Sequence, residues 1–152
     1  HSEDTTITQM LESIQQQFNV KVREKNITLS LCDTDLHVRC DPKWTVEAIG
    51  NIVDNAIKYT ACGGNVQVKA EQNSFFVKID IIDDGIGIEK EEIPKIFGRF
   101  YRSLSVADQP GVGIGLFLAR EIIQAQKGYI KVTSEREKGS TFSVFLPISK
   151  KE

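Results

Sequence analysis

Two neighbouring segments with alternating apolar residues constrain the fold most strongly. Residues 65–72 read NVQVKAEQ and residues 74–83 read SFFVKIDIID, with a short polar turn at Asn73 and Ser74 between them. Alternation with a period of two predicts strands, and the short connection predicts that they form an antiparallel hairpin. A sheet containing hairpins is therefore expected, and a doubly wound parallel sheet is disfavoured.

Three long helices are expected beside these strands. They cover residues 5–26, about 42–60 and 111–127. The first has an apolar face with helical spacing that consists of Ile7, Met10, Leu11, Ile14 and Phe18. Further strands are expected at 27–32, 36–40, 129–135 and 140–147, and a short helix around 89–93. This interleaving predicts a mixed, largely antiparallel sheet with helices on one face.

Composition narrows the classes of function. The 152 residues are expected to form a single domain, residues 1–152, with a sizeable core. The net charge of −2 gives no reason to expect nucleic-acid binding, and no apolar run is long enough to cross a bilayer. Cys32, Cys40 and Cys62 lack metal-site spacing and are expected to be reduced thiols of a cytosolic protein.

The second helix carries a polar stripe beside its apolar one. Asn51, Asn55 and Lys58 are spaced i, i+4 and i+7, so they share one face, and Tyr59 lies next to them. An amide oxygen suits Mg²⁺ that is already surrounded by phosphates, and a lysine suits a phosphate oxygen. A solvated polar face with a lysine near the helix C-terminus explains the same pattern equally well.

The hairpin strand ends in Asp83, and Gly85 and Gly87 follow. No nucleophile lies nearby, so the carboxylate is expected to accept a hydrogen bond, for example from the exocyclic amine of a purine. Glycines permit a sharp turn and the close approach of a ligand. The alternative is a plain turn, because Asp-Gly is common in turns.

Two further stretches suggest phosphate binding. Gly111, Gly113 and Gly115 run straight into the third helix, where free main-chain N–H groups attract anions. The alternative for these glycines is a flexible hinge. Before them, Arg99 and Arg102 are interleaved with aromatic residues, either as a lid whose arginine reaches phosphate or as a loop pinned by aromatic rings.

These four stretches and KGSTF at residues 138–142 follow one another in a characteristic order. Over residues 5–147 the chain resembles the catalytic ATP-binding domain of sensor histidine kinases, where the five motifs are called the N, G1, F, G2 and G3 boxes. The resemblance implies the Bergerat fold. This is a two-layer α/β (α+β) sandwich in which a mixed, largely antiparallel five-stranded sheet packs on three helices, with ATP between the layers.

The resemblance also implies roles for individual residues. Asn55 would coordinate Mg²⁺, Lys58 would contact phosphate, and Asp83 would accept a hydrogen bond from the adenine N6 amine. Arg102 is the preferred arginine for the γ-phosphate, with Arg99 second. The other implied nucleotide contacts are Asn51, Tyr59, Gly85, Gly87, Ile88, Gly111, Val112, Gly113, Ile114, Gly115, Leu116, and Ser140 or Thr141 at the adenine end.

Asn51 separates branches of this group of proteins. In the hydrolysing relatives a glutamate stands four residues before the Mg²⁺-binding asparagine and activates water, which an amide cannot do. The resemblance therefore implies slow ATP hydrolysis. It implies transfer of the γ-phosphate to a histidine on a separate dimerisation domain, and then to an aspartate of a response regulator. The expected catalytic residues are Asn51, Lys58 and Arg102.

The phosphate-accepting histidine is expected outside this chain, because neither His1 nor His37 lies in a motif resembling HELRTPL. The chain is expected to be a fragment of a longer kinase that binds ATP, does not phosphorylate itself and is a monomer. The resemblance implies a cytoplasmic domain of a parent protein in the bacterial membrane. Gly98 and Gln126 replace commoner acidic and histidine residues; Gly98 is expected to loosen the lid and Gln126 to touch nothing essential.

Three alternatives are weaker. A gyrase-type or Hsp90-type ATPase is disfavoured by Asn51, and an anti-sigma-factor serine kinase of the same fold is disfavoured by the KYT and RFYR stretches. A non-catalytic docking module with a vestigial pocket is disfavoured because every position needed for ATP is filled.

Overall fold

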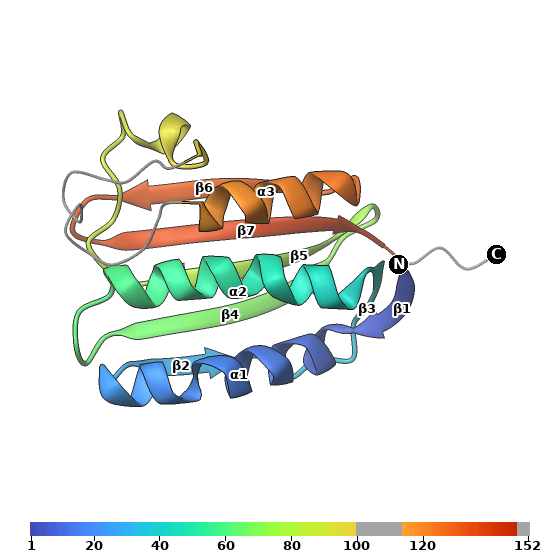
Figure 1. The fold of residues 1–152 in the computed structure, drawn as a ribbon, viewed down its shortest axis with the longest axis horizontal. Helices are drawn as coiled ribbons and strands as arrows, with labels where there is room; N and C mark the ends of the chain where they lie inside the picture. The colour runs from blue at the N-terminus through green and yellow to red at the C-terminus, as the bar shows by residue number, and fades with distance from the viewer. Residues whose placement is uncertain (100–113, 149–152) are drawn as a thin grey trace.

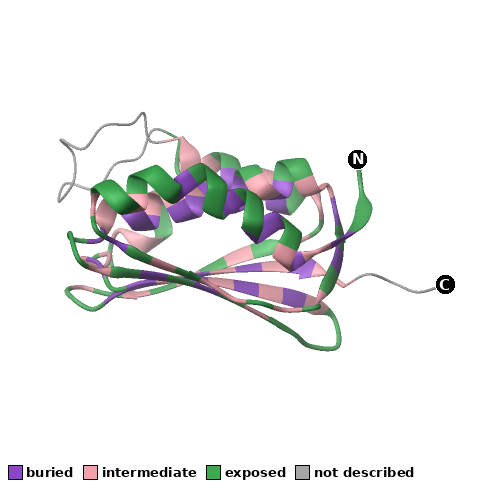
Figure 2. Cartoon of the chain, turned by 90° about the horizontal axis from the view of Figure 1, so that it is seen from below, coloured by how far each residue is buried: buried purple, intermediate pink, exposed green. Residues whose placement is uncertain are grey.

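A twisted sheet and a layer of helices face each other in this protein (Figures 1 and 2). The computed structural model describes residues 1–99 and 114–148. Within them, the helix layer consists of α1 (Ile7–Glu24), α2 (Pro42–Tyr59) and α3 (Gly115–Ala125). The large sheet consists of β2 (Thr28–Leu31), β4 (Asn65–Gln72), β5 (Phe76–Asp83), β6 (Tyr129–Glu135) and β7 (Gly139–Pro147).

The large sheet has the strand order β2-β4-β5-β7-β6. Only β2 and β4 are parallel neighbours, and the other three pairs are antiparallel. The hairpin expected from residues 65–83 is present as β4 and β5. The fold class is therefore confirmed: a mixed, mostly antiparallel five-stranded sheet with three helices on one face.

A second, two-stranded sheet was not expected from the sequence. It joins β1 (Glu3–Thr6) to β3 (His37–Cys40), which is the strand expected at residues 36–40. The first helix consequently begins at Ile7 instead of residue 5, because the Thr6 side chain caps it by accepting a hydrogen bond from the Gln9 N–H at 3.2 Å. Strands β2 and β3 thus belong to different sheets, although only residues 32–36 separate them in the sequence.

Two other boundaries differ from the sequence expectation. The short helix expected around residues 89–93 is instead a turn followed by the 3-10 helix η1 (Ile93–Lys95), with Pro94 in its first turn. Helix α3 ends at Ala125 because Lys127 adopts the left-handed conformation with a φ of 65°. The expected first residues of this helix, 111–113, lie outside the described residues.

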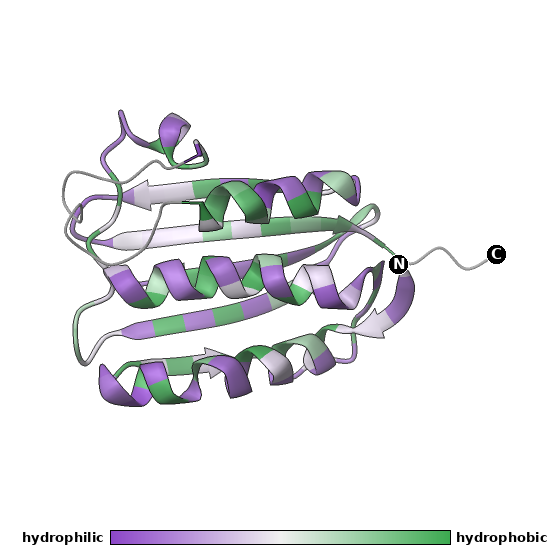
Figure 3. Ribbon diagram, viewed as in Figure 1, coloured by the Kyte–Doolittle hydropathy of each residue, from purple (hydrophilic) through white to green (hydrophobic). Residues whose placement is uncertain are grey.

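The core lies between the two layers. All five apolar residues predicted for the face of α1 are buried there, as are Ile49, Val53, Ala56 and Ile57 of α2. Strand β5 alternates along its whole length, with Val77, Ile79 and Ile81 facing the helices. Figure 3 shows the same alternation of hydrophilic and hydrophobic residues along β4. Each fully buried large aliphatic side chain stabilises the fold by roughly 1.5 to 3 kcal/mol.

Among residues 1–99 and 114–148, none of the helices has the length and apolar character needed to cross a membrane.

Candidate functional site

Asp83 is the last residue of β5, and its carboxylate is buried, with 7% of the residue exposed. Its Oδ1 accepts a hydrogen bond from the Gly85 N–H at 2.9 Å, and the Ser140 main-chain N–H also donates to it. Burial, helped by the nearby negative charge of Asp84, raises the pKa of Asp83 to about 6. The two N–H donors act in the opposite direction but do not outweigh burial. None of the described lysines and arginines forms an ion pair with Asp83, so the carboxylate keeps acceptor capacity for a ligand.

Asp84, the next residue, has a different role. Its two carboxylate oxygens accept hydrogen bonds from the main-chain N–H and the side-chain amide of Asn65, at 2.8 and 2.9 Å. These bonds lower the pKa of Asp84 below its usual value. Asp84 therefore ties the end of β5 to the start of β4, and only Asp83 has the environment of a ligand-binding group.

The loop after Asp83 is packed against main-chain atoms on two sides. A Cβ on Gly85 would lie 2.3 Å from the Tyr59 carbonyl oxygen, and a Cβ on Gly87 would lie 2.1 Å from that of Glu135. The N–H of Ile86, between the two glycines, donates to the same Tyr59 oxygen at 3.1 Å. From the sequence, these glycines were expected to permit the close approach of a ligand. The structure adds a second reason for them, because they let the loop pack against the end of α2 and against β6.

The strand register separates Ser140 from Thr141. Asp83 pairs with Ser140, and Ile82 pairs with Thr141. Because successive residues of a strand point to opposite faces, Ser140 lies on the helix-covered face beside Asp83, and Thr141 points away from it. The Ser140 hydroxyl lies 2.7 Å from that of Ser134, which accepts a hydrogen bond from the Ile88 N–H at 2.8 Å.

The polar stripe of α2 lies on the same side of the molecule as this loop. In Figure 1, α2 ends on the left, where the segment after β5 also leaves the sheet. The Asn51 side-chain nitrogen is buried and has no hydrogen-bond partner among the described residues. A Cβ on Gly115, at the start of α3, would lie 3.8 Å from the Asn51 side chain. Asn55 is partly buried on the same stripe.

These residues fit Mg²⁺ only as part of a nucleotide complex. No group of three or more histidine, cysteine or acidic residues within the described ranges could hold a metal by itself. Mg²⁺ generally keeps water ligands and takes further oxygens from substrate phosphates. The Asn55 amide oxygen could supply one ligand, and the unpaired Asn51 N–H group could donate to a phosphate oxygen.

The arginine-aromatic stretch is described as far as Arg99, whose guanidinium lies over the Phe117 ring of α3 at 5.0 Å from its centroid. Phe97 is buried edge-on against Phe142 of β7, with 6.2 Å between ring centroids. Ile114 immediately precedes α3, and Leu116 packs on the core. The remaining predicted site residues, Arg102, Gly111, Val112 and Gly113, lie outside the described residues.

Comparison with known proteins decides the family. Residues 40–150 match the family model described as "Histidine kinase-, DNA gyrase B-, and HSP90-like ATPase". The chain belongs to this ATPase family. It is 35% identical over 127 residues to the sensor histidine kinase WalK of Bacillus subtilis, a match that covers 81% of this chain and 21% of WalK. The chain thus spans about a fifth of this relative's length.

Solved structures agree with this histidine-kinase-like ATPase assignment. The mycobacterial sensor histidine kinase MprB superposes with a TM-score of 0.84 at 26% identity, covering 97% of this chain and 98% of that one. The histidine kinase ThkA in complex with the response regulator TrrA superposes with a TM-score of 0.79 at 25% identity, covering 97% of this chain and 42% of that one. The resemblance inferred from the five motifs is therefore confirmed.

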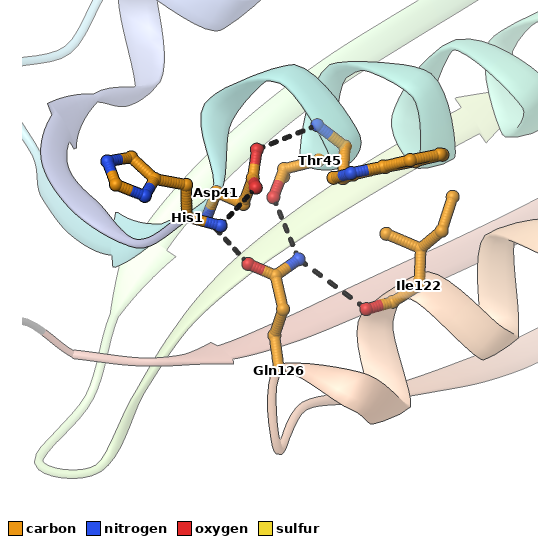
Figure 4. A network of polar contacts seen from close by, with 6 residues as sticks. His1, Asp41, Thr45, Ile122 and Gln126 are labelled. Atoms are coloured by element: carbon orange, nitrogen blue, oxygen red, sulfur yellow. Dashed lines mark hydrogen bonds and ion pairs between the residues drawn. The ribbon is translucent and has the colours of Figure 1, made fainter.

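One contact in this ATPase domain was missed by sequence reasoning. Gln126, expected to touch nothing essential, joins the end of α3 to the start of α2 (Figure 4). Its Oε1 accepts a hydrogen bond from the Asp41 N–H at 2.7 Å, and its Nε2 donates to Thr45 Oγ1 at 3.0 Å. These partners are more than 80 residues away along the chain, so no local pattern could reveal them.

Proposed function

We propose that this chain is the ATP-binding catalytic domain of a two-component sensor histidine kinase. The observation that carries the proposal is the buried Asp83 carboxylate, which has no cationic partner among the described residues and lies beside the loop that contacts the end of α2. A carboxylate held in this way is suited to accept a hydrogen bond from the N6 amine of adenine. The family membership and the relatives' names as sensor histidine kinases support this assignment.

In this proposal the helix α2 supplies the phosphate end of the site. Lys58 contacts phosphate, and Asn55 gives an amide oxygen to Mg²⁺, which neutralises developing charge on the phosphates. The buried, unpaired Asn51 side-chain nitrogen supports a role as a donor to phosphate. Arg102, or Arg99 in its place, contacts the γ-phosphate, for which a planar guanidinium is well suited.

The proposed reaction is phosphoryl transfer. The imidazole nitrogen of a histidine on a separate dimerisation domain attacks the γ-phosphorus, and ADP leaves. The phosphoryl group then passes to an aspartate of a response regulator. The structure of ThkA with the response regulator TrrA supports a partner of this class. We further propose that the domain lies in the cytoplasm and that its parent protein lies in the bacterial cell membrane.

Calorimetric titration with ATP, with and without Mg²⁺, tests the nucleotide site. We expect the unaltered chain to bind ATP and not GTP, because Asp83 accepts from the amine that guanine lacks at this position. Asp83→Asn should weaken ATP binding by about 10- to 100-fold, the loss expected from one charged hydrogen bond. Asp84→Asn is the matched control and should retain ATP binding, because Asp84 contacts Asn65. Equal losses in the two variants, or no ATP binding by the unaltered chain, would contradict the proposal.

The absence of a general base is tested separately. We expect slow ATP hydrolysis by the unaltered chain, because Asn51 cannot take a proton from water. Asn51→Glu should increase steady-state phosphate release. If the variant binds ATP normally and gains no turnover, Asn51 does not occupy the position of the missing base.

A further inference from the structure

The ammonium group of Lys58 already has a partner in this structure. Its Nζ lies 3.4 Å from Oδ2 of Asp54, one turn earlier on α2. The other oxygen of the same carboxylate accepts a hydrogen bond from Lys21 of α1 at 2.9 Å. Asp54 is therefore shared between two lysines, one of which is the proposed phosphate ligand.

The main chain at Lys58 is held by Lys25, the residue that follows α1. The Lys25 ammonium donates to the carbonyl oxygens of Ile57 and Lys58, at 2.8 and 2.9 Å. A cation at the C-terminal end of a helix is favoured by the helix dipole and satisfies carbonyl groups that lack partners within the helix. With its main chain fixed, Lys58 can exchange Asp54 for phosphate only by moving its side chain.

We propose that Asp54 and Lys21 are positioning residues that set the affinity of Lys58 for phosphate. Asp54 holds the Lys58 ammonium and competes with a phosphate oxygen for it. Lys21 pairs with the same carboxylate, so Asp54 keeps a counter-ion when Lys58 turns to the nucleotide. The inference rests on the proposed function, because it assumes that Lys58 contacts ATP.

The size of the effect follows from exposure. The side chains of Lys58, Asp54 and Lys21 are 33%, 26% and 56% exposed, so water screens each pair. Ion pairs of this kind change an equilibrium by about twofold to fivefold. We therefore expect tuning of affinity rather than an on-off switch.

Calorimetry with Mg²⁺-ATP and with adenosine tests the inference. Asp54→Asn should raise the affinity for ATP by about twofold to fivefold, and Lys21→Met should lower it by about twofold. Neither change should alter the affinity for adenosine, which has no phosphate. Asp54→Glu and Lys21→Arg keep the charges and should restore values near those of the unaltered chain.

Two controls remove a charge far from Lys58. Glu71 and Lys78 form an ion pair at 2.7 Å between β4 and β5, near the hairpin turn. Glu71→Gln and Lys78→Met change the net charge by the same amounts as the two test variants and should leave ATP affinity unchanged. If they shift ATP affinity as much as the test variants, net charge is the cause and the inference fails.

A double substitution tests whether Asp54 acts through Lys58. In a Lys58→Met background, Asp54→Asn should no longer raise ATP affinity. A rise of the same size would mean that Asp54 repels the phosphates directly, and it would overturn the inference while leaving the proposed function intact. Failure of the unaltered chain to bind ATP would overturn both. Equal changes for ATP and adenosine would show a purely structural effect and also overturn the inference.

Discussion

The two ends of strand β5 are held in different ways. At the Asp83 end, main-chain atoms approach so closely that only glycine fits: a Cβ on Gly139 would lie 2.0 Å from the Asp83 carbonyl oxygen. At the Phe76 end, aromatic side chains meet on the face that the helices leave uncovered. Tyr129 stacks on Phe145 with 4.4 Å between centroids, and Phe76 meets Tyr129 edge-on at 5.4 Å.

The difference separates a ligand-binding end from a stabilising end. Burying the Asp83 carboxylate with two N–H donors and no described cation costs stability, as its raised pKa shows. Stacked aromatic rings on a sheet surface instead contribute favourably, by about 0.5 to 1.5 kcal/mol per pair beyond the area they bury. Substitutions that displace Asp83 or its main chain should therefore change both stability and ATP binding, whereas substitutions at the second end should change stability alone.

The largest effect is expected from Gly139→Ala. Gly139 has a φ of 115°, and its added Cβ would meet the Asp83 main chain, so the variant combines backbone strain with a steric clash. We expect a loss of about 3 kcal/mol in the free energy of unfolding, measured by urea denaturation, and a loss of ATP affinity in the folded fraction. Gly63→Ala is the control, since Gly63 has a φ of 87° but nothing within 4 Å of the added Cβ. Equal losses in both would show that φ alone matters.

A pH series tests the buried carboxylate. The folded-state pKa of Asp83 is about 6, above its ordinary value of 3.8, so the folded state binds a proton more tightly than the unfolded state. The contribution of Asp83 to stability is therefore greatest below pH 4 and is lost as the pH rises through about 6, a change of about 3 kcal/mol. Asp83→Asn should remove this step from the difference between urea curves at pH 4 and pH 8. Persistence of the step in Asp83→Asn would assign it to other groups.

The same titration should appear in ligand binding with the opposite sign. Only the deprotonated Asp83 is an acceptor on both oxygens, so ATP affinity should fall as the pH drops below about 6. Stability and affinity would then change in opposite directions over the same pH range, which is the behaviour expected of a residue retained for function.

At the opposite end, Phe145→Ala should remove the stack on Tyr129 and the edge contact with Phe76. Because Phe145 is only partly buried, we expect a loss of about 1.5 kcal/mol in urea denaturation, with ATP affinity unchanged. Phe75→Ala is the control: Phe75 is 74% exposed, and its loss should cost less than about 0.5 kcal/mol. A fall in ATP affinity in Phe145→Ala would contradict the separation of the two ends.

Sequence patterns predicted the parts of the molecule that depend on neighbouring residues. The strands β4 and β5 and the apolar faces of α1 and α2 were predicted correctly. In each of them, the spacing of apolar residues along the chain identifies both the type of element and its buried face. The small sheet was missed because β1 is four residues long and pairs with a strand more than 30 residues away. Four residues are too few to show the alternation of apolar and polar residues that identifies a strand.

The same limit applies to the site. Asp83 could be selected from the sequence because it ends an alternating strand and precedes two glycines. Its difference from Asp84 could not, because that depends on Asn65 across the hairpin. Asp54 lies one turn before Lys58 in α2 and was not singled out from the sequence, and Lys25 approaches the same turn from the end of α1.

The smallest change in stability is expected at two non-glycine residues with positive φ, one near each end of β5, where relief of backbone strain involves no steric clash. Glu137, in the turn before β7, has a φ of 70°, and Lys127, in the turn before β6, has a φ of 65°. Neither is glycine, so each pays a conformational cost that glycine would relieve, and Glu137→Gly and Lys127→Gly should each raise the free energy of unfolding by about 0.5 to 1 kcal/mol.

Thermal denaturation with and without ATP measures both parts of this prediction. The Glu137 N–H donates to the Ile86 carbonyl at 2.7 Å, and glycine keeps that bond, so ATP affinity should stay within about twofold of the unaltered value in both variants.

Asn26, with a φ of 54°, gives a third comparison: asparagine tolerates this conformation better, and Asn26→Gly should gain less stability than either of the other two variants. A gain at Lys127 and a loss of stability or affinity at Glu137 would mean that the Asp83 end needs the Glu137 side chain as well as its backbone, and would deepen the contrast between the two ends.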